Sequence, residues 1–221
     1  MNGLSKDQLY EELARVGHAL GNGHRLEIID LLCQGERNVE ELAAEARLSL
    51  ANASQHLQIL HRAHLVQRRR EGVQVRYALA DPGVARLWMG LRDAAAERIP
   101  EVARVADGAL GPLGESDLIE QAEVERRLAT NQVFLLDVRP RLEYAAGHIA
   151  GSISLPLEEL ESRLSELPRE REIVAYCRGP FCTFANAALQ CLRAAGFRAR
   201  RMEAGYPEWN LSGRPVQVGA A

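Results

Sequence analysis

The sequence lacks the segments that would carry a chain into or across a membrane. No stretch approaches the run of about eighteen apolar residues that a spanning helix needs. Residues 1–17 contain no apolar core of the kind found in signal peptides. We therefore expect a cytoplasmic protein with no membrane partner.

Cysteine is scarce, and neither sign of charge dominates. The four cysteines, Cys33, Cys177, Cys182 and Cys191, are scattered along the chain, which fits a reducing compartment better than a disulfide scaffold. A formal net charge of -3 and a pI near 6.1 do not indicate a nucleic-acid-binding protein. Because such totals average over the whole chain, a local basic patch remains compatible with them.

Internal repeats and low-complexity tracts are also missing, and the two halves of the chain differ in pattern. Apolar positions recur mainly at helical spacing in the first half, whereas strand-like and helical runs alternate in the second. Between them, residues 107–117 contain three glycines and a proline without periodicity, as linkers do. The length suits two domains, which we place at 1–106 and 118–221.

The first domain begins as a series of helices. Apolar side chains recur at helical spacing over 9–20 and again over 26–32, where Gly35 marks the end of the second helix. Asn38 stands three residues before Glu41, the spacing of a capping box, and this predicts a short third helix. A short helix followed by another is the frame of a helix-turn-helix.

Residues 49–64 have the pattern of a helix that reads DNA. Ser49 is a natural N-cap, and the positions after it divide into an inner and an outer face. The inner face has Ala53, Leu57, Leu60 and His64; the outer face has Ala51, Gln55, Gln58 and Arg62, flanked by Asn52 and Ser54. Small and amide side chains allow close approach to the major groove and can pair with base edges.

A basic hairpin follows this helix. Residues 65–70 and 73–79 flank a turn at Glu71 and Gly72, and apolar side chains alternate with polar ones in the second strand. From Arg47 to Arg76 six arginines face a single acid, a local formal charge of +5 that attracts phosphates. The predicted DNA-binding residues are Ser49, Asn52, Ser54, Gln55, His56, Gln58, Arg62, Arg68, Arg69, Arg70 and Arg76.

Residues 26–79 resemble the winged helix-turn-helix of the ArsR/SmtB family of bacterial repressors, through the segment 49–60 and the basic wing. The resemblance implies a mainly α domain that binds a palindromic double-stranded DNA operator as a homodimer, packed through the helices at 9–20 and 84–105. The cysteine box of metal-sensing members is absent at 39–43, and Cys33 alone cannot make a thiolate site. His56, His61 and His64 have no acidic companions, so no metal site is predicted.

The second domain has the pattern of an α/β fold with a parallel sheet. Apolar runs at 133–136 and 173–176 suit strands buried on both faces, 183–195 suits a helix, and 197–202 suits a third strand. Cys177 follows the second strand and precedes the helix. Sites in such folds lie at the carboxyl ends of the strands, and a helix N-terminus lowers the pKa of a nearby thiol. We therefore predict that Cys177 is a nucleophilic thiolate.

This domain carries a second resemblance. Residues 135–156, with Asp137-Val138-Arg139 and Gly147-His148-Ile149, resemble the opening signature of a rhodanese domain, and residues 205–209 resemble its closing signature. The resemblance implies that Cys177 accepts sulfane sulfur as a persulfide, that Asp137 and Arg139 support the loop, and that no cofactor is needed. The residues implied to surround the charged sulfur with their backbone amides are Arg178, Gly179, Phe181, Cys182 and Thr183.

Cys182 departs from the rhodanese pattern. Rhodaneses that use thiosulfate have a second basic residue at this place, whereas here only Arg178 remains to neutralise an anionic donor. Rhodanese-like phosphatases and arsenate reductases end a longer loop with arginine, but Thr183 stands six residues beyond Cys177, so phosphoryl transfer is not expected. A second thiol within reach could attack a Cys177 persulfide and form a bridge. The alternative is that Cys182 only fills space under the helix.

The two resemblances together favour a homodimeric transcriptional repressor whose rhodanese domain senses a small sulfur donor or oxidant through Cys177, Arg178 and Cys182. Two other functions stay open. One is a working sulfurtransferase whose winged helix serves as an accessory DNA-binding or dimerising domain. The other is a repressor that responds to arsenite or a soft metal bound by Cys177 and Cys182, which requires a third ligand to be strong.

Overall fold

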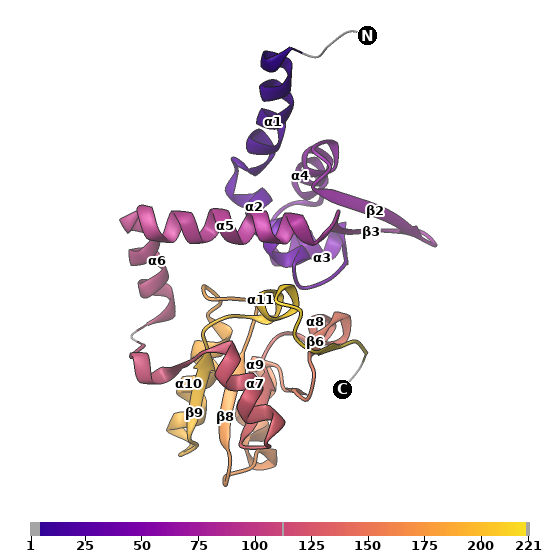
Figure 1. The fold of residues 1–221 in the computed structure, drawn as a ribbon. Helices are drawn as coiled ribbons and strands as arrows, with labels where there is room; N and C mark the ends of the chain where they lie inside the picture. The colour runs from indigo at the N-terminus through magenta and orange to yellow at the C-terminus, as the bar shows by residue number, and fades with distance from the viewer. Residues whose placement is uncertain (1–4, 112, 220–221) are drawn as a thin grey trace. The chain divides into compact units, whose positions relative to one another are not determined.

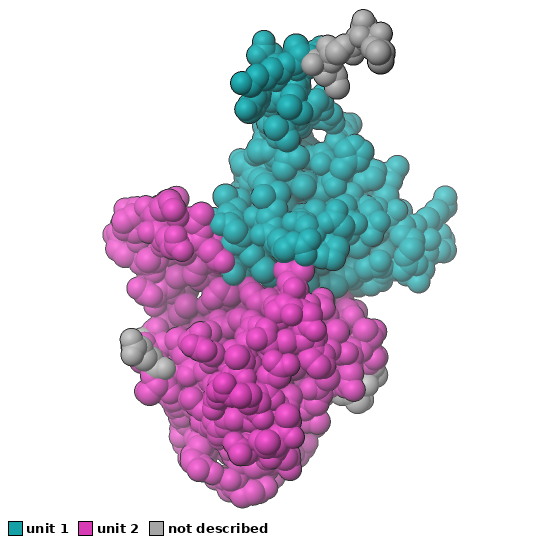
Figure 2. Space-filling model, in the orientation of Figure 1, with its two compact units in different colours: residues 1–92 teal, residues 93–221 magenta. Residues whose placement is uncertain are grey.

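The chain divides into two compact units. The computed structural model describes residues 5–111 and 113–219 (Figure 1), and it separates unit 1, residues 1–92, from unit 2, residues 93–221 (Figure 2). Helix α6 (Pro100–Leu110) covers the first four residues of the predicted linker at 107–117, while Pro112 lies outside the described residues. No helix in 5–111 or 113–219 combines the length and the apolar character of a membrane span.

Unit 1 has one apolar core. Ile28, Ile29, Leu42, Leu57 and Leu60 are fully buried at its centre. The elements around them are α1 (Lys6–Leu20), α2 (Gly23–Leu32), β1 (Arg37–Asn38), α3 (Val39–Glu45), α4 (Leu50–Arg62), β2 (Val66–Glu71), β3 (Gln74–Leu79) and α5 (Pro82–Arg98), whose last residues fall in unit 2. The predicted succession of two short helices and a hairpin is confirmed.

The helix starts are fixed by side chains that the sequence singled out. The Asn38 side chain accepts the N–H of Glu41 at 2.8 Å, and the Glu41 carboxylate accepts the N–H of Asn38 at 2.8 Å. Ser49 accepts the N–H of Asn52 at 3.2 Å and caps α4. Each bond satisfies an amide that the first helical turn leaves without a partner, so both predicted caps are confirmed.

Unit 2 is built on a parallel sheet with strand order β4-β9-β8-β5-β7. Its elements are α6, 3-10 helix η1 (Glu115–Asp117), β4 (Leu118–Ile119), α7 (Gln121–Ala129), β5 (Val133–Asp137), α8 (Arg141–Ala146), β6 (His148–Ile149), β7 (Ile153–Ser154), α9 (Leu157–Leu160), 3-10 helix η2 (Glu161–Glu166), β8 (Glu172–Tyr176), α10 (Phe184–Ala194), β9 (Ala199–Met202), α11 (Tyr206–Leu211) and β10 (Val216–Gln217). The predicted α/β class is confirmed.

Both faces of this sheet are covered, which explains why its strands read as continuous apolar runs. Ile173 and Ala175 of β8 belong to the cluster that includes residues of α10, whereas Val174 and Tyr176 belong to the cluster that includes Trp209 of α11. Strand β8 lies in the middle of the sheet and ends at Tyr176. Cys177 therefore stands at the carboxyl edge of the sheet, as predicted.

Candidate functional site

Helix α4 presents the predicted reading face to solvent. Ala53, Leu57 and Leu60 are buried on its inner side, and the polar side chains of the outer face remain accessible. Ser49, Ala51, Asn52, Gln55, Gln58 and Arg62 are exposed, and Ser54 is half-buried. The exposed amides lie on one solvent-facing side of a capped helix, which suits contact with base edges in a major groove.

One histidine of this region, His64, lies differently from the prediction, and the surroundings of His56 favour its neutral form. His56 is half-buried, its ring lies 5.7 Å from the ring of His24, and its Nδ1 is buried without a hydrogen-bond partner among the described residues. Burial, Arg25 and His24 lower the pKa of His56, so a neutral imidazole is favoured there over a phosphate-binding cation. His64 is exposed beyond the end of α4 with φ 57°, and its predicted place on the inner helix face is wrong.

The wing arginines form two groups. In the β2–β3 ladder Arg69 stands opposite Arg76, and both are paired with Glu36 and Glu71. Arg68 and Arg70 are exposed on the alternate positions of β2 and form no ion pair with any described acid. Alternate residues of a strand point to opposite faces, so Arg68 and Arg70 lie on the face opposite Arg69. Because no described acid pairs with them, they supply the free positive charge of the wing.

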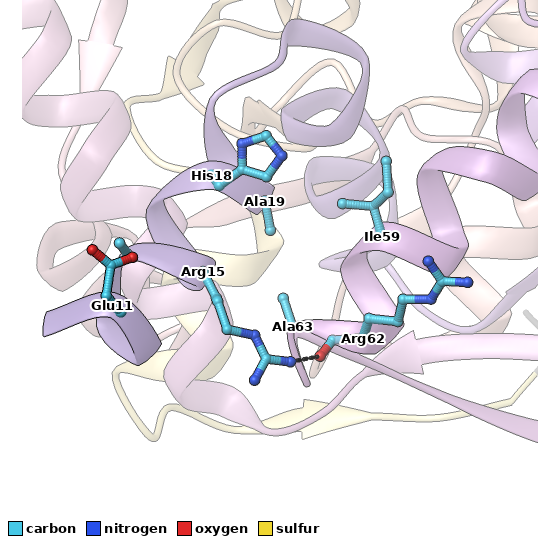
Figure 3. Close-up of a pocket in the computed structure, with 8 residues that line it drawn as sticks. Glu11, Arg15, His18, Ala19, Ile59, Arg62 and Ala63 are labelled. Atoms are coloured by element: carbon cyan, nitrogen blue, oxygen red, sulfur yellow. Dashed lines mark hydrogen bonds between the residues drawn. The ribbon is translucent and has the colours of Figure 1, made fainter. Parts of the chain in front are cut away.

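A groove of about 470 Å³ lies beside the carboxyl end of α4 (Figure 3). A guanidinium nitrogen of Arg15 on α1 donates a hydrogen bond to the backbone oxygen of Arg62 at 3.0 Å. The other residues that line the groove are Glu11, Ala14, His18, Ala19, Ile59 and Ala63. This bond satisfies one of the terminal carbonyls of α4 and ties the helix to α1.

The apolar stripe of α1 has little cover within one chain. Leu9, Tyr10 and Leu13 are 54%, 60% and 58% exposed, and Ala19 and Leu20 are the buried residues of this helix. Leu87 and Leu91 of α5 are also large apolar side chains with substantial exposure. Clusters of exposed apolar side chains on the terminal helices of a domain are typical of a surface that meets another protein.

The Cys177 loop, defined here as residues 177–183, is held from the ends of β9 and α11. The N–H of Tyr206 donates to the Cys177 oxygen at 3.0 Å. Arg201 donates to the Gly179 oxygen at 3.1 Å and to the Pro180 oxygen at 2.6 Å. At Gly205 the backbone approaches so closely that a Cβ would lie 2.6 Å from the Arg178 oxygen. The loop is therefore braced by three residues, Arg201, Gly205 and Tyr206, through contacts that the sequence patterns did not reveal.

The loop brings the two predicted thiols into hydrogen-bonding contact. Cys177 is only 2% exposed, and its sulfur lies 3.8 Å from the Gly179 oxygen and 3.7 Å from the Cys182 oxygen. Cys182 is half-buried, and its sulfur accepts a hydrogen bond from the thiol of Cys177. When one thiol of such a pair has lost its proton, the two sulfurs share the proton that remains. The surroundings of each sulfur decide which of them carries the negative charge.

The thiolate is favoured on Cys182 rather than on Cys177. Burial, together with the Cys182 thiol, raises the pKa of Cys177 well above its usual value. The hydrogen bond from Cys177, with backbone N–H groups of Arg178 and Phe184, lowers the pKa of Cys182 to about 7. The predicted low pKa of Cys177 is therefore wrong in this arrangement, because Cys177 is buried and the N–H groups of Arg178 and of Phe184, the first residue of α10, act on the Cys182 sulfur instead.

Arg178 is not free to neutralise a donor. Its Nε lies 2.9 Å from Oε1 of Glu143, and its Nη2 lies 2.5 Å from the same oxygen. The Glu143 side chain is fully buried, while Arg178 also lies over the ring of Phe184 at 5.2 Å. The predicted anion-binding charge is therefore already compensated by a carboxylate that the sequence did not mark as part of the site.

Asp137 and Arg139 form a buried support behind the loop. Both are fully buried and 2.6 Å apart, and Arg139 also donates to the Gly147 oxygen at 2.8 Å. The Tyr176 hydroxyl donates to Asp137 at 2.6 Å. Arg139 lies over the ring of Tyr206 at 4.4 Å, and the Tyr206 N–H binds the Cys177 oxygen. The Asp137–Arg139 ion pair therefore supports the loop indirectly, through Tyr206.

The remaining predicted loop residues are placed around these contacts. Gly179 is buried, and its oxygen accepts a hydrogen bond from the N–H of Cys182 at 3.1 Å. A hydrogen bond with the Gly179 backbone also lowers the pKa of the Cys177 thiol, against the larger effect of burial. Phe181 is 40% exposed and Thr183 is exposed. Since the amide of Cys182 already has a partner, fewer of the predicted amides are available to surround a sulfur on Cys177.

Sequence reasoning missed Arg201, Glu143 and Tyr206 as parts of the site. Arg201 had a readable signal, because in the predicted strand 197–202 it shares one face with the apolar Ala199. Glu143 and Tyr206 stood inside the two rhodanese signatures without an assigned role. In the described part of the chain no three His, Cys, Asp or Glu side chains are grouped as a metal site.

Comparison with known proteins supports both halves of the chain. Residues 22–68 match the family model "Bacterial regulatory protein, arsR family", and residues 120–212 match "Rhodanese-like domain". The HTH-type transcriptional regulator Rv0324 of Mycobacterium tuberculosis is 46% identical over 215 residues, which cover 97% of this chain and 94% of that protein.

Two further relatives each match one half. A protein named sulfurtransferase from Allochromatium vinosum is 31% identical over 99 residues, 44% of this chain and 92% of its own length. The solved homodimeric winged helix-turn-helix DNA-binding domain of a Mycobacterium bovis protein is 44% identical, with a TM-score of 0.41, and covers 45% of this chain and 94% of that chain.

Proposed function

Because this chain belongs to the ArsR-type winged helix-turn-helix transcriptional regulators and carries a rhodanese-like domain, we propose that it is a repressor controlled by reactive sulfur. In this proposal a cytoplasmic homodimer binds a palindromic operator and releases it when the Cys177 loop is modified. The observation that carries the proposal is the hydrogen-bonded pair Cys177 and Cys182, two thiols in one braced loop.

The DNA-binding half rests on α4 and the wing. The exposed amides of Gln55 and Gln58 suit base readout, and Arg68 and Arg70 have charges that no acid compensates among the described residues. The exposed apolar side chains of α1 and α5 suit a second copy of the chain. A homodimer of this kind places two reading helices on the two halves of a palindrome.

We expect Gln55→Ala and Arg70→Ala to weaken operator binding in different ways. Loss of the Gln55 amide should cost about 1–3 kcal/mol and relax base preference. Loss of Arg70 should reduce affinity for every sequence and flatten the plot of log K against log salt by about one unit. Fluorescence anisotropy at several salt concentrations, with an operator selected from a random library, measures both.

Arg69→Ala is the matched control for the wing. Its charge is compensated by Glu36 and Glu71, so its removal should change the salt slope much less than that of Arg70. Equal losses for Gln55→Ala, Arg69→Ala and Arg70→Ala on operator and random DNA would contradict this assignment.

The sulfur chemistry begins with the proton that the two thiols share. The Cys182 thiolate takes the proton of Cys177, and the Cys177 thiolate attacks the outer sulfur of a hydropersulfide RSSH. The S–S bond of RSSH breaks, RS⁻ leaves and takes the proton from Cys182, and Cys177 becomes the persulfide Cys177–S–SH. The Cys182 thiolate then attacks the Cys177 sulfur and expels HS⁻, which leaves a Cys177–Cys182 disulfide.

The pH dependence of Cys182 reactivity tests this first step. With a pKa of about 7, Cys182 should react with iodoacetamide at a rate that falls about tenfold per pH unit below 7 and levels off above 8. Replacing Cys177 by alanine removes a donor that stabilises the thiolate, so the profile should move to higher pH. Alkylation of the Cys182 peptide, quantified by mass spectrometry, gives the profile; an unchanged profile in Cys177→Ala would contradict the shared proton.

A working sulfurtransferase is the second candidate, favoured by the match of the rhodanese-like domain to a protein of that name. In that case sulfur leaves Cys177 for an external thiol and the winged helix has an accessory role. Steady turnover with a persulfide donor, unaffected by operator DNA, distinguishes it. A response to arsenite or a soft metal is less well supported, because the loop offers two thiols and a strong site needs a third ligand.

A further inference from the structure

Arg201 is a buried cation beneath the Cys177 loop. It is 3% exposed, and its guanidinium donates to three neutral oxygens: Gly179 O at 3.1 Å, Pro180 O at 2.6 Å and Asn186 Oδ1 at 2.7 Å. Its Nε is buried and has no hydrogen-bond partner among the described residues. Buried charges are normally paired, so a cation held only by carbonyl and amide oxygens requires an explanation.

The other arginines of the site each have a carboxylate. Arg139 is paired with Asp137, and Arg178 with Glu143. On the same strand as Arg201, Arg200 is paired with Glu172. No described acid lies within ion-pair distance of Arg201. The loop is thus left with one uncompensated positive charge.

The sheet places this charge on the same side as the reactive sulfur. In the parallel ladder Arg201 stands beside Ala175, two residues before Cys177. Ala199, Ala175 and Cys177 all belong to one buried cluster, and the alternation of strand residues puts Arg201 on that face. The positive charge of Arg201 lowers the pKa of the Cys177 thiol and opposes the effect of burial.

We infer that Arg201 is a positioning residue whose uncompensated charge stabilises a single negative charge at Cys177, first on the thiolate sulfur and then, after Cys177–S–SH loses its proton to solvent, on the outer sulfur of the persulfide anion. The inference rests on the proposed sulfur chemistry. Arg201 also orients the loop, because a trans peptide holds C=O and N–H in opposite directions. The bond from Arg201 to the Pro180 oxygen therefore turns the N–H of Phe181 away from Arg201.

The test measures the pH profile of Cys177 alkylation by iodoacetamide in a Cys182→Ser background, with neither DNA nor sulfur donor present. Arg201→Gln should move the profile of Cys177 to higher pH by one unit or more, about a tenfold loss of rate at pH 7. Arg201→Lys should restore most of that loss, because it retains the charge. Arg200→Gln, the matched control on the same strand, should leave the profile in place.

Asn186→Asp tests the same charge without removing the guanidinium. It is nearly isosteric and gives Arg201 the carboxylate it lacks, so it should shift the profile in the same direction as Arg201→Gln. Circular dichroism checks that each variant is folded. An unmoved profile in folded Arg201→Gln or Asn186→Asp overturns the inference, as does an equal shift in Arg201→Gln and Arg201→Lys. If the alkylation profiles move as expected but the unsubstituted protein does not release the operator on sulfur treatment, the proposed function alone is contradicted.

Discussion

Replacing Cys177 by serine is expected to abolish the response of operator binding to reactive sulfur. In the unmodified protein, a hundredfold loss of affinity on persulfide treatment corresponds to about 2.7 kcal/mol, which is within the usual range of coupling between sites. In Cys177→Ser the serine hydroxyl accepts no sulfur, so affinity with and without the donor should agree within about twofold. The measurement is operator affinity before and after treatment with an alkyl hydropersulfide.

Two further cysteine variants sharpen this result. Cys182→Ser should stop the reaction at the Cys177 persulfide, seen by mass spectrometry as the addition of one sulfur atom. Cys191→Ser is the matched control, because Cys191 lies half-buried on α10, outside the loop. Sulfur-induced release that persists in Cys177→Ser, or that disappears in Cys191→Ser, would contradict the assignment of the sensor to this loop.

The second large effect is expected at Gly205, where alanine should both destabilise unit 2 and displace the Cys177 loop. The backbone there has φ -106° and ψ -170°, which any residue adopts, so the need for glycine is one of space alone. An added Cβ would meet the backbone of Arg178 and Gly179, which cannot rotate away as a side chain does. We expect a loss of about 3 kcal/mol in the free energy of unfolding.

Urea unfolding of the full chain measures this loss in free energy, and hydrogen exchange of peptides from β8 and β9 shows that it arises in unit 2. Gly108→Ala is the matched control, since Gly108 lies in α6 with open space around its Cβ position. Alanine in a helix interior is favoured over glycine, so this control should gain about 0.5–1 kcal/mol. An equal, neutral outcome for both variants would show that the loop does not depend on the close approach at Gly205.

The sequence was sufficient for the fold because local and long-range signals agree in it. The capping pair Asn38 and Glu41 predicted α3, the N-cap Ser49 predicted α4, and unbroken apolar runs predicted the central strands β5 and β8. The end of the first domain was harder to place. Glycines and a proline indicated a linker from residue 107, yet α6 continues to Leu110 because glycine at position 108 is tolerated in a helix.

The site was only half predictable, for a physical reason. Cys177 and Cys182 were found through their position after a strand, but the division of charge between them depends on which amides point at which sulfur. That direction is set by Arg201, Tyr206 and Gly205, which are distant in sequence from most of the loop that they hold. A pattern read along the chain contains residue types and spacing, whereas a pKa depends on burial and neighbours in space.

The ion pair between Arg178 and buried Glu143 has a consequence for the binding of inorganic anions at the loop. Sulfate and phosphate are abundant there, and an arginine with a free charge at the mouth of a reactive loop would attract them. With its charge already met by a carboxylate, Arg178 offers such oxyanions no net attraction, and the uncompensated charge of Arg201 is buried beneath the loop. We therefore expect its modification to be insensitive to competition by common inorganic anions.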